Sequence, residues 1–335
     1  MPIMDFGFTQ DQLEFARASR DIFARFSDLD SLRQAWQAED PDDSHWHRLA
    51  ELGVLGLLAP EAHGGLGASE VDLVLVLEEA GRYAVRGPLV EHAAVVVPTL
   101  VGVVDDSPDV VADWLDDAAR GNIKVSAAPS KDAVTEGETA DLVMIVEHGT
   151  VYAVQRGDIR AVRPKTSVDR TRRLAELDYS RALPIPGVDP VIFVSRGAAG
   201  TAAALCGLAS RMIEMTGEYV KDRHQFGVPV GSFQAVKHHL ADALIALEHA
   251  RPAMYYAAWS LATHQPTAAR DASFAKVYAN EAAGLAARVA LQCHGAIGYT
   301  FEHHLHYWLK RVWALQRAWG TTDQHRRQVA DAVLA

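Results

Sequence analysis

The chain has 335 residues, of which 49% are apolar and 22% charged, a composition typical of a folded protein with two or three structural units. Its net charge of −11 argues against a nucleic-acid partner, because phosphate contacts require a basic face. The two cysteines, Cys206 and Cys293, show no paired or metal-type spacing, which argues against a disulfide scaffold and fits a reducing cytoplasm.

The sequence also gives no membrane signal. Its N-terminus lacks the basic-then-apolar pattern of a signal peptide. The longest apolar run, residues 93–104, contains Pro98 and is shorter than the ~20 residues that a membrane helix needs. We therefore expect a soluble, cytoplasmic protein without a membrane partner.

The first third of the chain predicts helices. Thr9 and Gln12 form a capping-box pattern ahead of apolar residues at helical spacing. Further helices are predicted over 43–52, from Ala68 or Ser69 onward, and around 91–104, with a turn rich in proline and glycine over 57–72. Together they define an N-terminal helical domain over residues 1–118.

Residues 119–190 predict a small β unit. Short β-type runs begin at Ile123, and the segment Glu147–Thr150 has the composition of a hairpin turn. A two-sheet barrel of ordinary size would need more residues, so we expect a truncated middle β domain.

Long helices are predicted again over residues 191–335. The expected helices are 200–221, 233–262, 268–292, 301–319 and 323–334. Pro252 falls inside the second of them and is expected to kink it or to lie near a turn. The predicted fold class is mainly α with a small β insert, ending in a four-helix bundle domain.

Two motifs in this last region carry a resemblance. The first is Arg223-His-Gln-Phe-Gly227, followed by Phe233-Gln234, and the second is Gln292-Cys-His-Gly295-Ala-Ile-Gly298 with Glu302 after it. In this order and spacing they resemble the two signatures of the flavin-dependent acyl-CoA dehydrogenases. The segment 49–67 is similar to the turn in that family's first domain, so the resemblance covers nearly the whole chain.

The resemblance implies an FAD site. An arginine fork suits the pyrophosphate, an aromatic ring supplies an apolar face, and glycines let backbone N–H groups approach phosphate or ribityl oxygens. In the family the two motifs come from different subunits and meet across a dimer interface, which implies an oligomer whose chains share each FAD. The implied cofactor-binding residues are Arg223, Gln225, Phe226, Gln234, Gln292, Gly295, Gly298 and Thr321.

The sequence departs from the family at the general base, so we assign no catalytic residue to this chain. Most members place a glutamate 21 residues after the last glycine of the second motif, where this chain has Trp319. Other members place it near the position of Gly197, and no carboxylate lies close to that position either. We hypothesise that Trp319 takes the place of the missing carboxylate and closes the acyl pocket.

Other family features are missing or altered. The middle-domain loop that contacts flavin is reduced to Thr135-Glu136, the glycine pair of the second motif is Gly295-Ala296, and Lys310-Arg311 replaces an arginine–aspartate pair. The chain therefore resembles the short subunits of actinobacterial α2β2 acyl-CoA dehydrogenases that act on steroid side-chain CoA thioesters. A homologous full-length subunit would then supply the base, and an electron-transfer flavoprotein would accept the electrons.

Three other functions stay open at this point. A flavin-dependent monooxygenase, or another flavoenzyme of the same fold, could work without the glutamate. A homomeric dehydrogenase could use an unrecognised base, and a structural subunit would catalyse nothing. The histidine clusters at 238–239 and 303–306 do not have zinc-site spacing, so no metal is expected, and Cys293 is interpreted as a packed residue.

Overall fold

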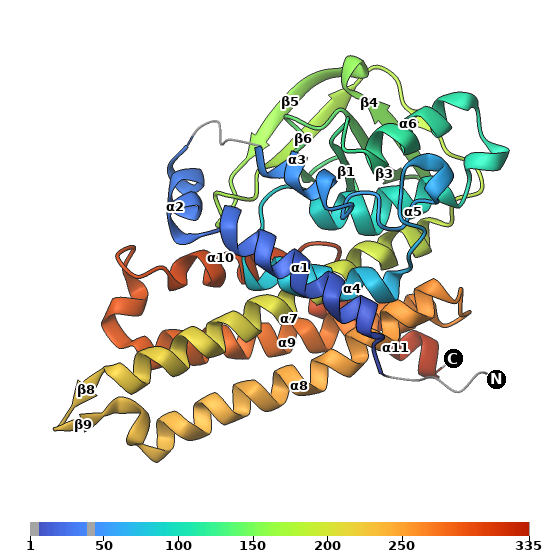
Figure 1. Ribbon diagram of the computed structural model, residues 1–335. Helices are drawn as coiled ribbons and strands as arrows, with labels where there is room; N and C mark the ends of the chain where they lie inside the picture. The colour runs from blue at the N-terminus through green and yellow to red at the C-terminus, as the bar shows by residue number, and fades with distance from the viewer. Residues whose placement is uncertain (1–6, 39–43, 335) are drawn as a thin grey trace.

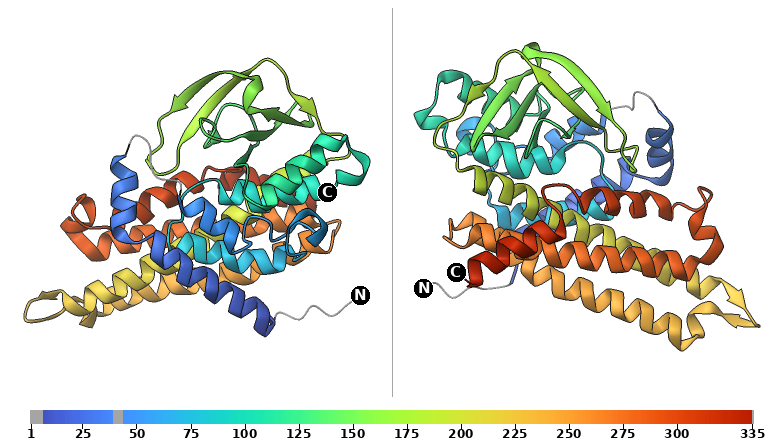
Figure 2. Two further views of the ribbon diagram at one scale, coloured as in Figure 1. Left: turned by 45° about the horizontal axis from the view of Figure 1, so that its top comes forward. Right: turned by 180° about the vertical axis from the view of Figure 1, so that it is seen from behind.

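The computed structural model describes residues 7–38 and 44–334. Long helices form the body of the molecule, and a β unit lies on one side of it, flanked by helices from the first third of the chain (Figures 1 and 2). The order is helices over 10–119, strands over 125–184, and helices over 190–334. The predicted fold class is confirmed.

The first helices begin where their capping residues stand. Helix α1 (Gln10–Phe26) starts after Thr9, which forms the expected capping box with Gln12. Helix α4 (Glu70–Arg82) starts in the same way after Ser69, whose partner is Asp72. Both predicted helix starts are therefore correct.

The sequence analysis did not predict helix α2 or the later helix α6 (Asp109–Ala119). Helix α2 (Leu29–Gln37) begins at Asp28, whose carboxylate accepts a hydrogen bond from the Ser31 amide at 2.8 Å. Helix α3 (Ser44–Glu51) matches the prediction over 43–52, except that the predicted first residue, Asp43, lies outside the described residues.

The predicted helix over 91–104 is divided and shorter than expected. It consists of a wider π-helical segment, η2 (Val90–Val96), and one α-helical turn, α5 (Val97–Val101). Pro98 has no amide hydrogen to donate to an earlier turn, which suits the first turn of α5 rather than the interior of a longer helix. Helix α6 (Asp109–Ala119) follows.

The middle region forms two small sheets. The first has the strand order β1-β3-β4-β7 and the second β2-β6-β5. Strands β3 (Leu142–Glu147) and β4 (Thr150–Gln155) form the predicted hairpin, and the left-handed φ angles of His148 and Gly149 suit a type I′ turn. The other strands are β1 (Val125–Ala128), β2 (Val134–Thr135), β5 (Ile159–Lys165), β6 (Leu174–Tyr179) and β7 (Leu183–Pro184).

The C-terminal helices agree with the prediction, with changed boundaries. They are α7 (Pro190–Asp222), α8 (Gln234–Ala262), α9 (Ala268–His294), α10 (Leu305–Leu315) and α11 (Thr322–Leu334). Pro252 lies inside α8, which continues through it. Between α7 and α8 the short strands β8 (His224–Gln225) and β9 (Val228–Pro229) project beyond the bundle (Figure 1).

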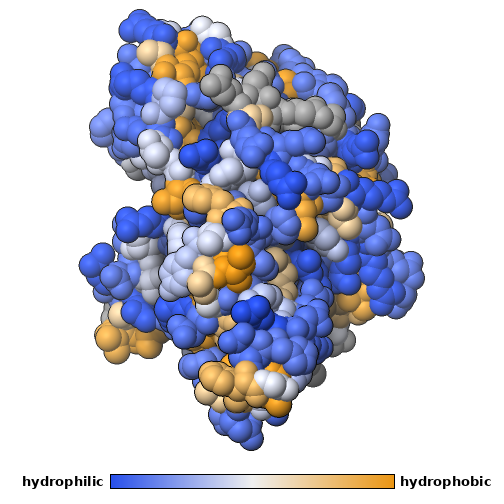
Figure 3. Space-filling view, turned by 90° about the vertical axis from the view of Figure 1, so that its left-hand side faces the viewer, coloured by the Kyte–Doolittle hydropathy of each residue, from blue (hydrophilic) through white to orange (hydrophobic). Residues whose placement is uncertain are grey.

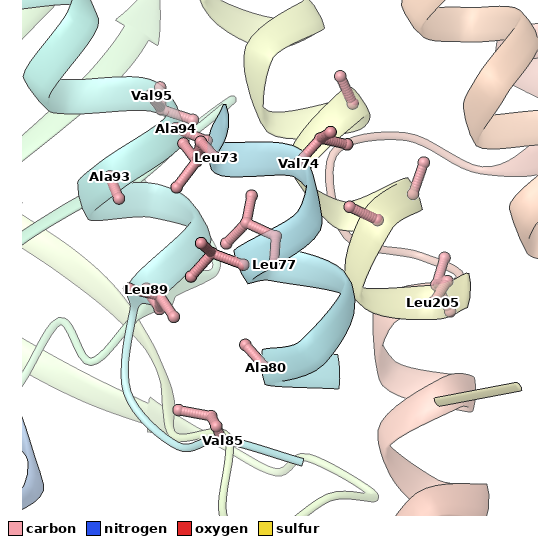
Figure 4. Packing of buried hydrophobic residues seen from close by; sticks show 14 of the residues in the cluster. Leu73, Val74, Leu77, Ala80, Val85, Leu89, Ala93, Ala94, Val95 and Leu205 are labelled. Carbon is pink, nitrogen blue, oxygen red and sulfur yellow. The ribbon is translucent and has the colours of Figure 1, made fainter. Parts of the chain in front are cut away.

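Helices α4 and α7 touch through their backbones. A Cβ atom on Gly207 of α7 would lie 1.8 Å from the Glu78 carbonyl oxygen of α4, and one on Gly81 would lie 2.0 Å from the Ala204 carbonyl oxygen. Only glycine permits so close an approach. The apolar face of α4, with Leu73, Leu77 and Ala80, then packs between η2 and α7 (Figure 4).

Helix α7 is long and apolar enough to cross a membrane, but 72% of its apolar window is buried inside the protein. This burial is typical of the core helix of a folded domain.

Arg311 of α10 joins three parts of the molecule. Its guanidinium forms an ion pair with the buried Asp169 and donates hydrogen bonds to the Val85 carbonyl oxygen at 2.8 Å and to Thr171 Oγ1 at 2.7 Å. The bundle, the segment before β6 and the end of α4 are therefore fixed to one another by one charged side chain.

The substitution Arg311→Met is expected to lower the free energy of unfolding by ~3–5 kcal/mol, because it leaves the buried Asp169 charge without a partner. Urea denaturation followed by circular dichroism measures this loss. The control Arg326→Met breaks the exposed pair with Glu281 and should cost less than about 1 kcal/mol. Equal losses in the two variants would contradict the role assigned to Arg311.

Candidate functional site

The first motif forms the exposed hairpin at the end of α7. Arg223 caps α7, and the turn between β8 and β9 consists of Phe226 and Gly227, both with left-handed φ angles. Phe226 is 92% exposed, and its ring lies 6.3 Å from that of Phe233 in an edge-to-face pair. The predicted residues Arg223, Gln225, Phe226 and Gln234 all lie exposed on this hairpin or at the start of α8.

The second motif covers the end of α9 and the turn that follows. Gln292 is exposed, and α9 ends at His294, where Gly295 turns the chain with φ 62° and ψ −141°. Apart from Gly295 itself and its two chain neighbours, no described residue has an atom within 4 Å of the place where a Cβ on Gly295 would stand, so the backbone here is open to a ligand. Gly298 is buried against His294.

The two motifs lie at the same end of the bundle within one chain. Helices α7 and α9 run in the same direction, because α8 returns the chain between them (Figures 1 and 2). Tyr219, four residues before Arg223, stacks on His294 with ring centroids 4.3 Å apart. Bundle topology thus brings the two motifs to the same end of one chain, and the sharing of each FAD between chains stays a prediction.

Phe226 and Phe233 belong to a group of apolar side chains on the surface of this end of the molecule. Small apolar groups stand among hydrophilic side chains on the face that Figure 3 shows. The other large apolar residues that are exposed at this end are Val228, Tyr299 and Phe301. They are candidates for contact with a cofactor or a second chain.

Thr321 is not brought to this site. It lies at the opposite end of α10 from Gly298, next to the first turn of α11. Its amide donates to Gln324 Oε1 at 2.8 Å, and its hydroxyl lies 3.1 Å from the same oxygen. The predicted cofactor residues are thus divided between two places in the fold.

Trp319 lies on Gly197, so the two positions where the family carries its base face each other. A Cβ atom on Gly197 would stand 2.1 Å from the indole ring. Trp319 is only 4% exposed, and its ring makes an edge-to-face contact with Phe193 at 6.0 Å. The indole therefore fills the space in which a carboxylate at either position would have to work, which supports the hypothesis made from the sequence.

A buried polar network holds the loop that carries Trp319. His325 Nε2 donates to the Trp319 carbonyl oxygen at 3.0 Å. Lys276 is fully buried, and its Nζ donates to Asn280 Oδ1 at 2.9 Å and to the Leu315 carbonyl oxygen at 3.0 Å. These bonds hold Trp319 in its left-handed backbone conformation, with φ 59°.

A cleft of about 360 Å³ lies between the β unit and the C-terminal helices. The walls include Trp313, Arg317 and Trp319 on one side and Ala127 to Pro129 on the other.

The inner end of the cleft is closed by a polar triad. Thr135 Oγ1 donates to Glu91 Oε1 at 2.9 Å, and Arg172 Nη2 lies 3.3 Å from the same oxygen and 2.8 Å from Thr135 Oγ1. The cavity behind the triad measures about 50 Å³, room for a few water molecules and not for an acyl chain. Thr135, the remnant of the flavin-contacting loop, is thus used internally.

Sequence reasoning missed four polar side chains that shape these places: Tyr219, Lys276, Arg172 and His294. His294 stands at a variable position inside the second motif, and the others lie outside any motif, so no sequence signal marked them. Burial raises the pKa of the Cys293 thiol, in keeping with a packed residue. Across residues 7–38 and 44–334, no group of three or more His, Cys, Asp or Glu side chains could hold a metal ion.

Comparison with known proteins identifies the family. Residues 9–121 match the N-terminal domain and residues 193–334 the C-terminal domain of acyl-CoA dehydrogenases. The chain is 34% identical to the acyl-CoA dehydrogenase IpdE2 of Mycobacterium tuberculosis over 81% of this chain and 80% of that protein, and 32% identical to IpdE2 of Mycolicibacterium smegmatis over 90% and 91%. The chain therefore belongs to the acyl-CoA dehydrogenase family.

Solved structures show the same fold. A chain of the ChsE4–ChsE5 complex from Mycobacterium tuberculosis superposes with a TM-score of 0.88 at 23% identity, covering 99% of both chains. A chain of the Tcur3481–Tcur3483 steroid acyl-CoA dehydrogenase variant gives the same score and identity over 97% and 98%. Butyryl-CoA dehydrogenase from Megasphaera elsdenii gives 0.86 at 21% identity over 99% and 100%.

Because Gly197 and Trp319 are in contact, we expect substitutions at the two positions to have non-additive effects on the free energy of unfolding. Gly197→Ala should destabilise the protein by ~1–3 kcal/mol, because the new methyl group overlaps the indole. In a Trp319→Gly background the same change should cost less than about 0.5 kcal/mol. Urea denaturation of the four proteins measures the coupling, and equal costs in both backgrounds would contradict it.

Lys276 is expected to make stability depend on pH. Burial, together with the charge of Arg172, lowers its pKa from 10.5 to about 7. Between these values the unfolded chain binds one more proton than the folded chain, so the free energy of unfolding should rise with pH above about 7. Lys276→Met should flatten this rise in urea denaturation, whereas the exposed-site control Lys237→Met should keep it. A rise of equal slope in Lys276→Met would contradict the assignment.

Proposed function

We propose that this chain is one subunit of a hetero-oligomeric, FAD-dependent acyl-CoA dehydrogenase. The observation that carries the proposal is a difference between the cofactor-binding motifs and the position of the catalytic base. The exposed cofactor motifs around Arg223 and Gly295 are kept, apart from Ala296 in place of a glycine, whereas Trp319 closes the place of the catalytic base. The chain would bind part of the cofactor, and a homologous full-length subunit would carry out proton abstraction.

The residues at the exposed end suit a dinucleotide flavin. Arg223 presents a guanidinium fork for a pyrophosphate, and Phe226 presents an aromatic face that makes few contacts within the chain. The open backbone at Gly295 allows a phosphate or ribityl oxygen to approach. Thr321 stays in the proposed cofactor set as a residue of the second place, beside the cleft.

The reaction that we propose is α,β-desaturation of an acyl-CoA thioester. A base takes the α-proton while FAD, when bound, accepts hydride from the β-carbon. The three atoms nearest to a Cβ on Gly197 all belong to the Trp319 indole, and neither base position carries a carboxylate, so the base would belong to the partner subunit. An electron-transfer flavoprotein is the proposed electron acceptor, and a cytoplasmic location remains a prediction.

The relatives support a steroid side-chain CoA thioester as the substrate class. One structural neighbour is described as a steroid acyl-CoA dehydrogenase, and another is the ChsE4–ChsE5 complex, an assembly of two different chains. Both are under 25% identical to this chain, so they support the fold directly and the substrate and assembly only by analogy.

The alternative functions predict different outcomes. A flavoenzyme that works without a glutamate would bind FAD as a homo-oligomer, and a homomeric dehydrogenase would turn over a thioester alone. The contact between Trp319 and Gly197 favours neither, since the indole occupies the place beside Gly197 where a base of this chain would stand.

The deciding experiment is purification of the chain alone and after co-expression with the full-length acyl-CoA dehydrogenase encoded nearest to it. We expect flavin absorbance and thioester oxidation only in the joint assembly, with the mass measured by light scattering. Arg223→Gln should weaken FAD binding to that assembly ~10- to 100-fold, the effect of losing hydrogen bonds to a charged group. Arg327→Gln, an exposed change on α11, is the matched control.

Two results would count against the proposal. Turnover of a thioester by the lone chain would show that it holds its own base. Absence of FAD from every assembly that contains the chain would remove the cofactor from the proposal.

A further inference from the structure

Three aromatic rings stack where the two cofactor motifs meet. Tyr219 comes from the last turns of α7, His294 from the end of α9, and His303 from the segment before α10. The Tyr219 and His294 rings are nearly parallel, with an interplanar angle of 21° and centroids 4.3 Å apart. His303 meets His294 edge-on at 4.5 Å and Tyr219 at 5.9 Å.

The central ring of this stack is fixed in place. His294 is 3% exposed, and its Nδ1 donates to the Ala290 carbonyl oxygen at 2.8 Å, since a carbonyl can only accept. The Nε2 atom is then a bare acceptor, and it has no hydrogen-bond partner among the described residues. Ring stacking is what holds the far side of this imidazole.

Tyr219 also holds the backbone next to the His294 ring. The Tyr219 hydroxyl donates to the His294 carbonyl oxygen at 3.4 Å, which fixes the peptide that links His294 to Gly295. Gly298 packs on the other side, where an added Cβ would lie 3.0 Å from the Cβ of His294. Tyr219 therefore restrains the turn that begins at Gly295, whose own surroundings are open.

Both histidines of the stack favour the uncharged form. Burial is the main cause that lowers the pKa of His294, and burial together with His294 and His304 lowers the pKa of His303 to about 4. Stacking of neutral rings is not opposed by repulsion between charges. The stack is thus a stable bridge between α7 and α9.

We propose that Tyr219 and His294 are positioning residues for the flavin site, holding the hairpin of Arg223 in register with the turn at Gly295. The inference rests on the proposed function. Neither ring needs to touch the cofactor. Their contact sets the distance between two segments that are otherwise exposed and separately connected to the bundle.

The test uses the assembly co-expressed with the full-length subunit and measures the dissociation constant of FAD after the flavin is removed and titrated back. Tyr219→Ala should raise this constant about 10-fold or more, because it removes both the stacked ring and the hydroxyl. Tyr219→Phe keeps the ring and should stay within about threefold of the wild type. The mass of each assembly by light scattering must equal that of the wild type.

Tyr278→Ala is the matched control. Tyr278 also pairs with a neighbouring ring, that of Phe274 at 4.7 Å, but it lies roughly 24 Å along α9 from His294. This variant should bind FAD as the wild type does. A loss of FAD affinity equal to that of Tyr219→Ala would overturn the inference. It would show that removing any aromatic ring from the bundle weakens FAD binding.

Other outcomes are equally decisive. Wild-type affinity in Tyr219→Ala, or a tenfold loss in Tyr219→Phe, would overturn the role of the stacked ring. If Tyr219→Ala fails to assemble, Tyr219→Leu replaces it, because leucine keeps the apolar volume without the aromatic face, and the same thresholds apply. A wild-type assembly that binds no FAD refutes the proposed function itself, whereas a flavin-bound assembly with unaffected variants refutes only the positioning role.

Discussion

The close contact between α4 and α7 determines the layout of the molecule. Gly81 and Gly207 let the two backbones touch, so the N-terminal helices and the bundle share one apolar core. With its first two-thirds buried in this way, α7 serves as the central helix of the structure. Its last turns extend past the shared core, and the hairpin of Arg223 is exposed as a consequence.

The same helix explains why the chain's own base position is closed. Gly197, near the beginning of α7, offers a flat patch of backbone, and the Trp319 indole lies on it. Lys276 and His325 hold the loop that carries the indole, through hydrogen bonds to the carbonyl oxygens of Leu315 and Trp319. In the proposed function, this packing contact stands where the family's reactive centre would be.

This arrangement separates two tasks that a full-length subunit performs together. The exposed end presents cationic, aromatic and open backbone groups, which suit binding to an extended anionic cofactor. The inner region, around Glu91, Thr135 and Arg172, satisfies its polar groups internally, and only a cavity of about 50 Å³ lies behind it. Exposed binding groups together with an internally paired interior are what the proposed supporting subunit would need.

Much of the fold could be predicted from local sequence. The capping residues Thr9 and Ser69 predicted two helix starts, and the Glu147–Thr150 turn predicted the hairpin, because these signals act over three or four residues. Strands β2, β6 and β7 were missed. The two-residue strands β2 and β7 have no periodicity and exist only through pairing with distant partners, and β6 forms by pairing with β2 and β5. The predicted extent of the 91–104 helix was wrong. The helix changes from the π to the α type next to Pro98 and ends at Val101, which depends on its packing in the folded protein.

For the candidate site, the sequence by itself determined the residue types: the arginine, aromatic and glycine motifs, and the lack of a carboxylate at both base positions. Only the tertiary structure decided that the two motifs lie side by side in one chain, that Thr321 lies apart from them, and that Trp319 rests on Gly197. Motifs are local and can be recognised residue by residue. Contacts between residues 75 or more positions apart, such as Tyr219 and His294, depend on how whole helices pack, which no short segment encodes.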